Sequence, residues 1–319
     1  MNTIKSVANP YGDKVIVVDW GTTSLRCMLI AGEGKILAET GSEGGIQFIK
    51  NKRFESELMA AIGGWLEENG PIPVLALGMI TSKSGWVEVP YVPCPATAES
   101  LANGMIRASL SNGSDLFFLS GITDKTRFPF PDVMRGEETQ ILGFGLEEEL
   151  TIVLPGTHSK WARVGGGEIS KFQTFVTGEV FALFAQHSFI AKAAGQDSRD
   201  DNWDAMLHGA RIAKAAAVHD AAFLTQLMSV RTGMLADELT ADQMLSYLSG
   251  LIIGSEFRQA MEAGWFKPGD TIGIIGNDGL NDRYRRVSEI FELHIKDGGA
   301  QAAVVGALQI FAGSSTNAA

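Results

Sequence analysis

The residues from Val15 to Arg26, which read VIVVDWGTTSLR, restrict the fold of this chain more than any other stretch. The β-branched run 15–18 is typical of a strand buried on both faces. Asp19 stands where that strand ends, a poor place for a charge unless the carboxylate meets a cation or water. Gly21 lets the backbone turn closely, and the hydroxyl residues 22–24 offer side chains and amides that suit phosphate oxygens. The alternative is a plain polar hairpin turn, since Asp-x-Gly turns are common.

A similar pattern occurs again in the second half of the chain. A buried-type strand at 152–154 is followed by PGTHSK at 155–160. In both places a strand leads into Gly-Thr, a variable residue, Ser and a nearby basic residue, and a hairpin follows. The repetition predicts two related halves that face each other. It favours a phosphate clamp, built from amides, hydroxyls and a basic side chain of each half, over two unrelated turns.

Composition restricts the class of protein. The chain has 319 residues, which indicates two domains of roughly 150 residues each. Its net charge of −11 argues against nonspecific binding to nucleic acid or to an anionic membrane. The two cysteines form no disulfide framework and match no zinc-site spacing. The sequence contains neither a signal-peptide core nor a membrane-spanning apolar run, so we expect a cytoplasmic protein.

Apolar strands alternate with helical patterns along the chain, which predicts an α/β fold. The periodicity predicts one continuous helix from Ala96 to Leu110 and another from Thr177 to about Ala194. Near the end, Thr271 to Asn277 reads as a strand that ends in glycine before a helix. That arrangement fits the close approach of a nucleotide to a helix N-terminus.

Two adjacent acids, Glu137 and Glu138, follow Arg135 at the start of a helical pattern. Acids favour the first turn of a helix because they offset its dipole, and this alone explains the pattern. The other interpretation is a general base beside a cation that orients an anionic group. The residues by themselves leave both interpretations open.

These patterns resemble the superfamily that includes actin, the seventy-kilodalton chaperones and the sugar kinases. The residues that look like its first phosphate motif are Asp19, Gly21, Thr22 and Thr23, and those that look like its second are Gly156, Thr157, His158 and Ser159. The segment similar to its adenosine motif comprises Gly273 to Asn277 and Gly279. The resemblance implies two ribonuclease-H-like (actin-like ATPase) domains, 1–149 and 150–319, with a nucleotide cleft between them. The last helix, which follows Gly298 and Gly299, resembles the connecting helix that packs at the hinge.

The ordered set DWGTTSLR, GMITSKSGW, VMRGEETQ, PGTHSKW and TGEV is similar, more narrowly, to the 2-dehydro-3-deoxygalactonokinases. The resemblance covers nearly the whole chain. This family phosphorylates the 6-hydroxyl of 2-dehydro-3-deoxygalactonate with ATP in galactonate breakdown. The resemblance therefore implies ATP and Mg²⁺ as cofactors and a small sugar acid as substrate, with no nucleic-acid or membrane partner. A homodimer is left open.

The resemblance and the chemistry together give each residue an expected role. Asp19 organises Mg²⁺, and the two Gly-Thr turns hold the β- and γ-phosphates. We expect Lys160 or His158 to offset charge on the transferred group, while Arg26 either does the same or pairs with a neighbouring acid. The catalytic base is expected to be Glu138, then Glu137, with Asp132 as the third candidate.

The remaining candidate residues belong to the two ligands. Those expected on the nucleotide are Gly276, Asn277 and Gly279; those expected on the sugar acid are Lys83, Ser82, Gly85, Trp86 and Arg135. Lys83 and Arg135 supply the cations that the substrate carboxylate needs, although Trp86 reads equally well as a packing residue. Two other functions remain as alternatives: an exopolyphosphatase-like phosphohydrolase, and a nucleotide-binding sensor of the same fold without catalysis.

Overall fold

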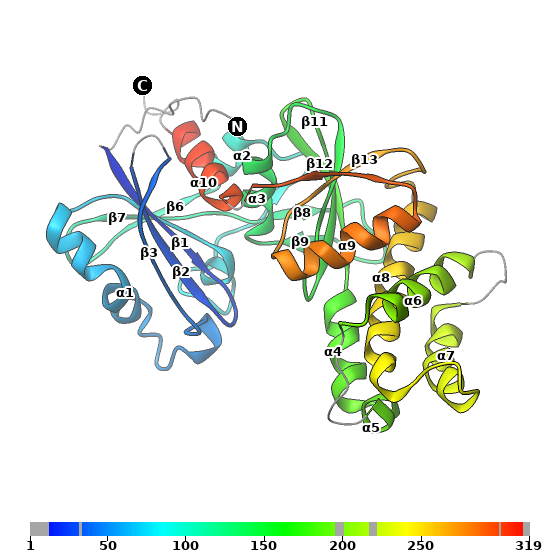
Figure 1. Ribbon diagram of the computed structural model, residues 1–319. Helices are drawn as coiled ribbons and strands as arrows, with labels where there is room; N and C mark the ends of the chain where they lie inside the picture. The colour runs from blue at the N-terminus through cyan, green and yellow to red at the C-terminus, as the bar shows by residue number, and fades with distance from the viewer. Residues whose placement is uncertain (1–12, 32–33, 195–200, 217–221, 300, 315–319) are drawn as a thin grey trace. The chain divides into compact units, whose positions relative to one another are not determined.

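The computed structural model describes residues 13–31, 34–194, 201–216, 222–299 and 301–314 (Figure 1). They fall into two compact units. Unit 1 is drawn from Met1–Glu149, Val164–Phe172 and Gly299–Ala319, and unit 2 from Leu150–Arg163 and Gln173–Gly298. Each unit combines a mixed β-sheet with helices.

Unit 1 begins with an antiparallel hairpin and continues with strands that alternate with short helices. Its strands are β1 (Lys14–Trp20), β2 (Leu25–Ala31), β3 (Ile36–Ser42), β4 (Val74–Leu77), β5 (Val92–Pro93), β6 (Ile106–Ser109), β7 (Asp115–Phe118), β8 (Ile122–Asp124) and β9 (Asp132–Met134). Its helices are α1 (Phe54–Asn69), α2 (Ala98–Asn103), α3 (Glu137–Phe144), α10 (Ala302–Gly313) and the 3₁₀ turns η1 (Ile46–Phe48) and η2 (Gly78–Thr81).

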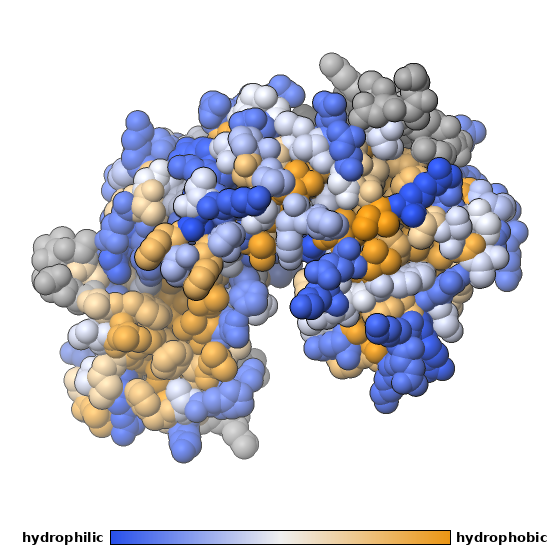
Figure 2. Space-filling model, turned by 180° about the vertical axis from the view of Figure 1, so that it is seen from behind, coloured by the Kyte–Doolittle hydropathy of each residue, from blue (hydrophilic) through white to orange (hydrophobic). Residues whose placement is uncertain are grey.

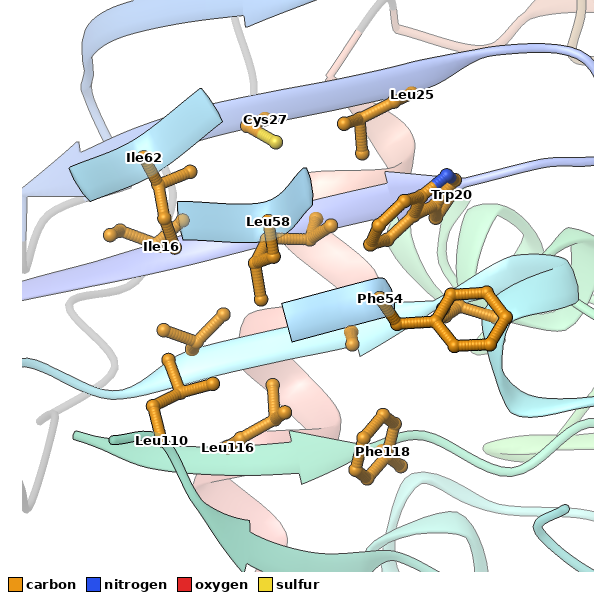
Figure 3. Close-up of a cluster of buried hydrophobic side chains, with 14 of the residues drawn as sticks. Ile16, Trp20, Leu25, Cys27, Phe54, Leu58, Ile62, Leu110, Leu116 and Phe118 are labelled. Atoms are coloured by element: carbon orange, nitrogen blue, oxygen red, sulfur yellow. The ribbon is translucent and has the colours of Figure 1, made fainter. Parts of the chain in front are cut away.

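The main sheet of unit 1 has the order β3-β2-β1-β4-β7-β6. The first three strands pair antiparallel, whereas β4 is parallel to β1 and β7 is parallel to β4. Helix α1 covers one face, where Phe54, Leu58 and Ile62 point onto side chains of β1, β2 and β7 (Figure 3). Helix α10 packs on the other face, where Phe311 contacts Phe117 of β7 at 5.0 Å between ring centroids.

Unit 2 repeats this arrangement with a helical region added after its third strand. Its sheet is made of β10 (Leu150–Leu154), β11 (Ser159–Gly165), β12 (Glu168–Phe175), β13 (Thr271–Ile274) and β14 (His294–Asp297). Residues 164–165 of β11 and 168–172 of β12 group with unit 1 by their contacts. Its helices are α4 (Thr177–His187), α5 (Phe189–Ala194), α6 (Trp203–Ala215), α7 (Phe223–Leu235), α8 (Met244–Glu262), α9 (Asp278–Ile290) and the 3₁₀ turn η3 (Ala241–Gln243).

Five strands of the unit 1 sheet have the same order as the five strands of the unit 2 sheet. The sheet of unit 2 runs β12-β11-β10-β13-β14, so its first strand is central, flanked by the second and then the third on one side. The fourth and fifth strands follow on the other side and are parallel to the first. Strands β3, β2, β1, β4 and β7 of unit 1 are arranged in the same way. The predicted fold class, α/β with two ribonuclease-H-like units, is confirmed.

The helical region of unit 2 is organised around α8. Glycines let α6 and α8 approach so closely that a Cβ at Gly250 would lie 1.7 Å from the backbone oxygen of Met206. Figure 2 shows apolar residues gathered over this region, at the lower left of the view. The exposed apolar side chains include Leu183, Phe189, Leu224, Met228 and Leu235. No helix among the described residues is both long enough and apolar enough to span a membrane.

Two predicted helices are divided in the structure. The segment Ala96 to Leu110 forms α2 and then strand β6, because Ile106–Ser109 pairs antiparallel with β7. The segment Thr177 to Ala194 breaks at Ser188 into α4 and α5. The hydroxyl of Ser188 donates to the Phe184 carbonyl and accepts from the Ile190 amide, so it ends one helix and begins the next. Both predictions of a single helix were wrong.

We expect the contact between α3 and α10 to be sensitive to a single added methyl group. A Cβ at Gly306 would lie 1.8 Å from the backbone oxygen of Thr139, so Gly306→Ala should destabilise unit 1 by about 1–3 kcal/mol. Gly64→Ala on α1 is the control, since no atom lies within 4 Å of the added Cβ. The control should be neutral or slightly stabilising. Equal melting temperatures for the two variants would contradict this packing.

Candidate active site

A four-residue turn, 21–24, joins β1 to β2. The Gly21 amide donates to the Ser24 carbonyl at 2.9 Å, and the Ile46 amide donates to the Gly21 carbonyl at 3.0 Å. The Trp20 indole donates to the Gly44 carbonyl at 2.9 Å, which fixes the neighbouring segment against the turn. The side chains of residues 22–24 remain exposed. The turn is therefore held by its backbone, and its hydroxyl groups are available to a ligand.

Asp19 lies at the end of β1, opposite Arg26 of β2 and Leu77 of β4. Burial first, and the charge of Glu137 second, raise the pKa of its carboxyl group to about 6, while the charge of Arg26 opposes them. Arg26 itself pairs with Glu39 at 2.6 Å, which supports the second of its two predicted roles. Two carboxylates thus interact beside the turn, an arrangement that fits a cation.

Helix α3 begins with both predicted acids. Glu137 is partly exposed, and one of its oxygens accepts from the Arg135 amide at 3.0 Å. Glu138 is only 1% exposed and accepts from the Gly136 amide at 2.8 Å and from the Thr139 hydroxyl at 3.1 Å. Burial, and secondarily the charge of Glu137, raise the pKa of Glu138 to about 8. The two acids therefore have different environments, one accessible and one enclosed.

Arg135 is 9% exposed and connects three segments of unit 1. One terminal nitrogen donates to the Thr81 hydroxyl at 2.7 Å, and the other donates to the Val89 carbonyl at 2.8 Å. Its guanidinium stacks over the Tyr91 ring at 4.2 Å from the centroid. Within the described part of the chain, its Nε has no hydrogen-bond partner. Two of the three nitrogens thus hold the loop that follows η2.

The other residues predicted for the sugar acid lie in that loop. Ser82 is buried and donates to the Met79 carbonyl at 2.7 Å, and Lys83 is exposed. Gly85 is required because a Cβ there would lie 2.1 Å from the Ile80 carbonyl oxygen. Trp86 is partly buried and its ring contacts Phe54 and Phe118, with centroids at 6.2 and 5.5 Å. Trp86 therefore packs against the core of unit 1, and Lys83 presents the accessible cation.

In unit 2 another four-residue turn, 155–158, follows β10. Thr157 and His158 are exposed, and the first turn of α4 lies directly against them. The Glu179 amide donates to the Thr157 carbonyl at 3.0 Å, and the Glu179 carboxylate meets the His158 ring at 2.6 Å. A Cβ at Gly178 would lie 2.6 Å from the Gly156 oxygen, so this approach requires glycine.

Lys160 lies one residue into β11 and is 6% exposed. Its ammonium donates to the Thr174 hydroxyl at 2.7 Å. A phosphate contact by Lys160 would require this hydrogen bond to rearrange. His158 is the more accessible of the two predicted basic groups.

The segment between β13 and α9 lies beside the 155–158 turn. A Cβ at Gly276 would lie 3.5 Å from Cδ of Pro155, which shows how near the two loops are. Asn277 caps α9 by accepting from the Leu280 amide at 2.9 Å. Gly276, Asn277 and Gly279 are all exposed around the start of the helix. Unit 2 therefore combines an exposed turn and a helix N-terminus, a combination that suits an anion.

Sequence reasoning missed one residue of this region, Glu256 of α8. It is 2% exposed, and it accepts hydrogen bonds from Ser159 and Trp161 of β11. An acid inside an otherwise apolar helical run was the signal that could have revealed it, because an enclosed carboxylate needs donors from elsewhere in the fold.

Among the described residues, no three or more His, Cys, Asp and Glu side chains are grouped so as to hold a metal ion. A dedicated protein cage is not needed for magnesium, which keeps several waters and takes one or two carboxylates together with substrate phosphates. The partly exposed Asp19 beside Glu137 fits that donor set.

Two units with the same strand order, each with a four-residue turn after its first strand, define an α/β protein of the ribonuclease-H-like, actin-like ATPase class. Residues 19–310 match the model of the 2-keto-3-deoxy-galactonokinase family. The chain belongs to this family.

Individual relatives agree with that membership. The chain is 32% identical over 292 residues to a probable 2-dehydro-3-deoxygalactonokinase of Rhizobium meliloti (strain 1021), covering 90% of this chain and 92% of the relative. It is 31% identical over 274 residues to the 2-dehydro-3-deoxygalactonokinase of Escherichia coli (strain K12), covering 86% and 88%. A crystal structure of a candidate 2-dehydro-3-deoxygalactonokinase from Sinorhizobium meliloti superposes with a TM-score of 0.81 at 28% identity, covering 96% of this chain and 100% of that one.

The raised pKa of Glu138 gives a prediction about stability. The folded chain keeps a proton there up to about pH 8, whereas an ordinary glutamate releases it near pH 4.5. Because the folded state binds more protons between these values, stability falls as pH rises through this window. Glu138→Gln lacks that proton, so its stability relative to wild type should rise over the window by on the order of 3–5 kcal/mol and then level off. Melting temperatures across the pH range test this, and a pH-independent difference would contradict it.

Proposed function

We propose that this chain is an ATP-dependent kinase that phosphorylates the 6-hydroxyl of 2-dehydro-3-deoxy-D-galactonate in galactonate catabolism. The names of both curated relatives support the substrate and the reaction. The observation that carries the proposal is the pair of carboxylates, Asp19 and Glu137, on two elements that approach each other through Gly78 and Gly136, beside the exposed turn that follows β1. A phosphotransferase needs a metal ligand, hydrogen-bond donors for the phosphate oxygens and a general base close together, and this region offers all three.

Unit 1 supplies the metal ligand and the groups for the sugar acid in this proposal. Asp19 would hold Mg²⁺ through its carboxylate or through water, and Thr22 and Thr23 donate to phosphate oxygens in a turn that Gly21 lets approach closely. When bound, the ion offsets negative charge on the phosphates. Lys83 pairs with the sugar carboxylate because its ammonium is exposed, and Arg135 acts mainly by holding the loop that carries Ser82, Gly85 and Trp86.

Unit 2 supplies the groups for the nucleotide. Gly156 and Thr157 donate to phosphate oxygens, and His158 lies beside them in the same exposed turn. Gly276, Asn277 and Gly279 line the place of the adenosine at the start of α9. We keep Lys160 as a second basic group, which reaches the transferred phosphoryl only if its bond to Thr174 is exchanged.

The base belongs to the acid pair of α3. A base must lie within hydrogen-bond reach of the proton that it takes, and the partial exposure of Glu137 supports placing it first. Glu137 then accepts the proton of the sugar hydroxyl as that oxygen bonds to the γ-phosphorus and ADP leaves. Glu138 stays enclosed and fixes the start of α3 through the Gly136 amide. This reverses the order expected from the sequence.

The remaining parts of the proposal concern partners and location. ATP and the sugar acid are its small-molecule partners, and the reaction takes place in the cytoplasm, where ATP is supplied. The exposed apolar side chains on the helical region of unit 2 support a homodimer. Sedimentation of the purified chain at several concentrations tests that state.

ADP release with Mg-ATP and a panel of acceptors tests the reaction. The panel holds 2-dehydro-3-deoxygalactonate, 2-dehydro-3-deoxygluconate, galactonate, galactose and no acceptor. Turnover should be confined to the deoxy keto acids. Galactose in particular should not react, because it has no carboxylate for Lys83 to pair with. Equal turnover without acceptor would replace the proposal with a phosphohydrolase. ATP binding without turnover would replace it with a sensor.

Substitutions at the two acids test the base. Glu137→Gln should lower kcat by about 10²–10⁴-fold and leave ATP binding unchanged, because a lost proton acceptor affects the chemical step. Glu138→Gln is the matched neighbour, and we expect it to keep most of its turnover. A loss of turnover in Glu138→Gln alone would make Glu138 the base, as the sequence analysis expected. Near-full rates in both variants would show that neither acid is the base.

A further inference from the structure

Glu256 is a carboxylate surrounded by hydrogen-bond donors inside unit 2. One of its oxygens accepts from the Ser159 hydroxyl at 2.7 Å and from the Trp161 indole at 2.6 Å. The other accepts from the Tyr284 hydroxyl at 2.6 Å and from the Thr177 hydroxyl. All four donors are side chains, and they come from three elements other than its own helix.

Each of those three elements adjoins a segment assigned above to the nucleotide. Ser159 begins β11, directly after the 155–158 turn. Thr177 begins α4, whose first turn donates to the Thr157 carbonyl. Tyr284 lies on α9, whose first turn follows Gly276 and Asn277. One carboxylate therefore joins the turn, the helix that lies against it and the helix at the adenosine segment.

Stability alone does not explain a carboxylate at this position. Burial raises the pKa of Glu256, and the bonds from Thr177, Tyr284, Trp161 and Ser159 only partly oppose that effect. An enclosed charge costs more than an apolar side chain of similar size would. Such groups persist where they define one geometry among several packed alternatives, and here the geometry is that of three elements that flank the segments assigned to the nucleotide.

We propose that Glu256 is a positioning residue for the nucleotide, and that it acts by holding β11, α4 and α9 in one arrangement through its four hydrogen bonds. The proposal rests on the kinase function for the identity of the nucleotide. The four donors enclose the Glu256 carboxylate, so we assign it no direct contact with either substrate. Its effect is therefore confined to the affinity for ATP.

Two substitutions separate geometry from charge. Glu256→Ala removes the shared acceptor and leaves four donors without it. Glu256→Gln keeps the network, because its oxygen can face the indole of Trp161, which only donates, while its amide donates to the hydroxyls of Thr177 and Tyr284. Ile253→Ala is the control for a general loss of stability, since it removes buried atoms from the same helix outside the network.

The test is calorimetric binding of a non-hydrolysable ATP analogue with Mg²⁺, together with KM for each substrate. We expect Glu256→Ala to weaken analogue binding and raise KM for ATP by about tenfold or more, with kcat and KM for the sugar acid changed by less than about threefold. Glu256→Gln and Ile253→Ala should bind the analogue within about threefold of wild type.

Three results would overturn the proposal: unchanged analogue binding in Glu256→Ala, an equal loss in Ile253→Ala, or an equal loss in folded Glu256→Gln. The kinase function fails separately. If the wild-type chain itself does not bind the analogue, the assignment of ATP is wrong. If the wild-type chain binds the analogue and the Glu256 variants bind it equally well, the kinase function stands and the positioning role of Glu256 is wrong.

Discussion

The candidate site of unit 1 depends on the absence of side chains at Gly78 and Gly136. Gly78 follows β4, whose last residue pairs with Asp19, and it adopts a φ of +85°. A Cβ there would lie 3.1 Å from the Asp19 carboxylate, and a Cβ at Gly136 would lie 3.4 Å from the Gly78 Cα. The end of β1 and the start of α3 are neighbours only because both positions are glycine. The interaction between Asp19 and Glu137 follows from that closeness.

In unit 2, the segments of the candidate site are held together by a different kind of interaction. There the segments near the 155–158 turn are held by polar side chains that share one enclosed acceptor, Glu256, rather than by bare backbone contact. The close approach at Gly178 is the exception, where α4 meets the turn directly. The two halves thus keep the same strand order while their loops are fixed by different interactions.

Local signals could be predicted from the sequence, whereas interactions between distant residues could not. The β-branched runs and Gly-Thr turns gave β1, β10 and both four-residue turns, because strand and turn preferences act over a few residues. The helix predicted over Ala96 to Leu110 failed because pairing with β7 overrides local periodicity. The partners of Arg135 lie 54 and 46 positions away, and those of Glu256 as far as 97, so no pattern in a short window reveals them.

The close contact between α6 and α8 at Gly250 limits how far α8 can move independently of α6. The first half of α8 is locked to α6, where Gly250 allows backbone contact with Met206, and Glu256 lies less than two turns further along the same helix. Helix α8 has 19 residues, and a closely packed helix transmits displacement because protein interiors are nearly incompressible. Because Glu256 accepts hydrogen bonds from β11, α4 and α9, a displacement of α8 would act on all three elements. The contact between α6 and α8 is thus linked, through Glu256, to the elements that flank the 155–158 turn.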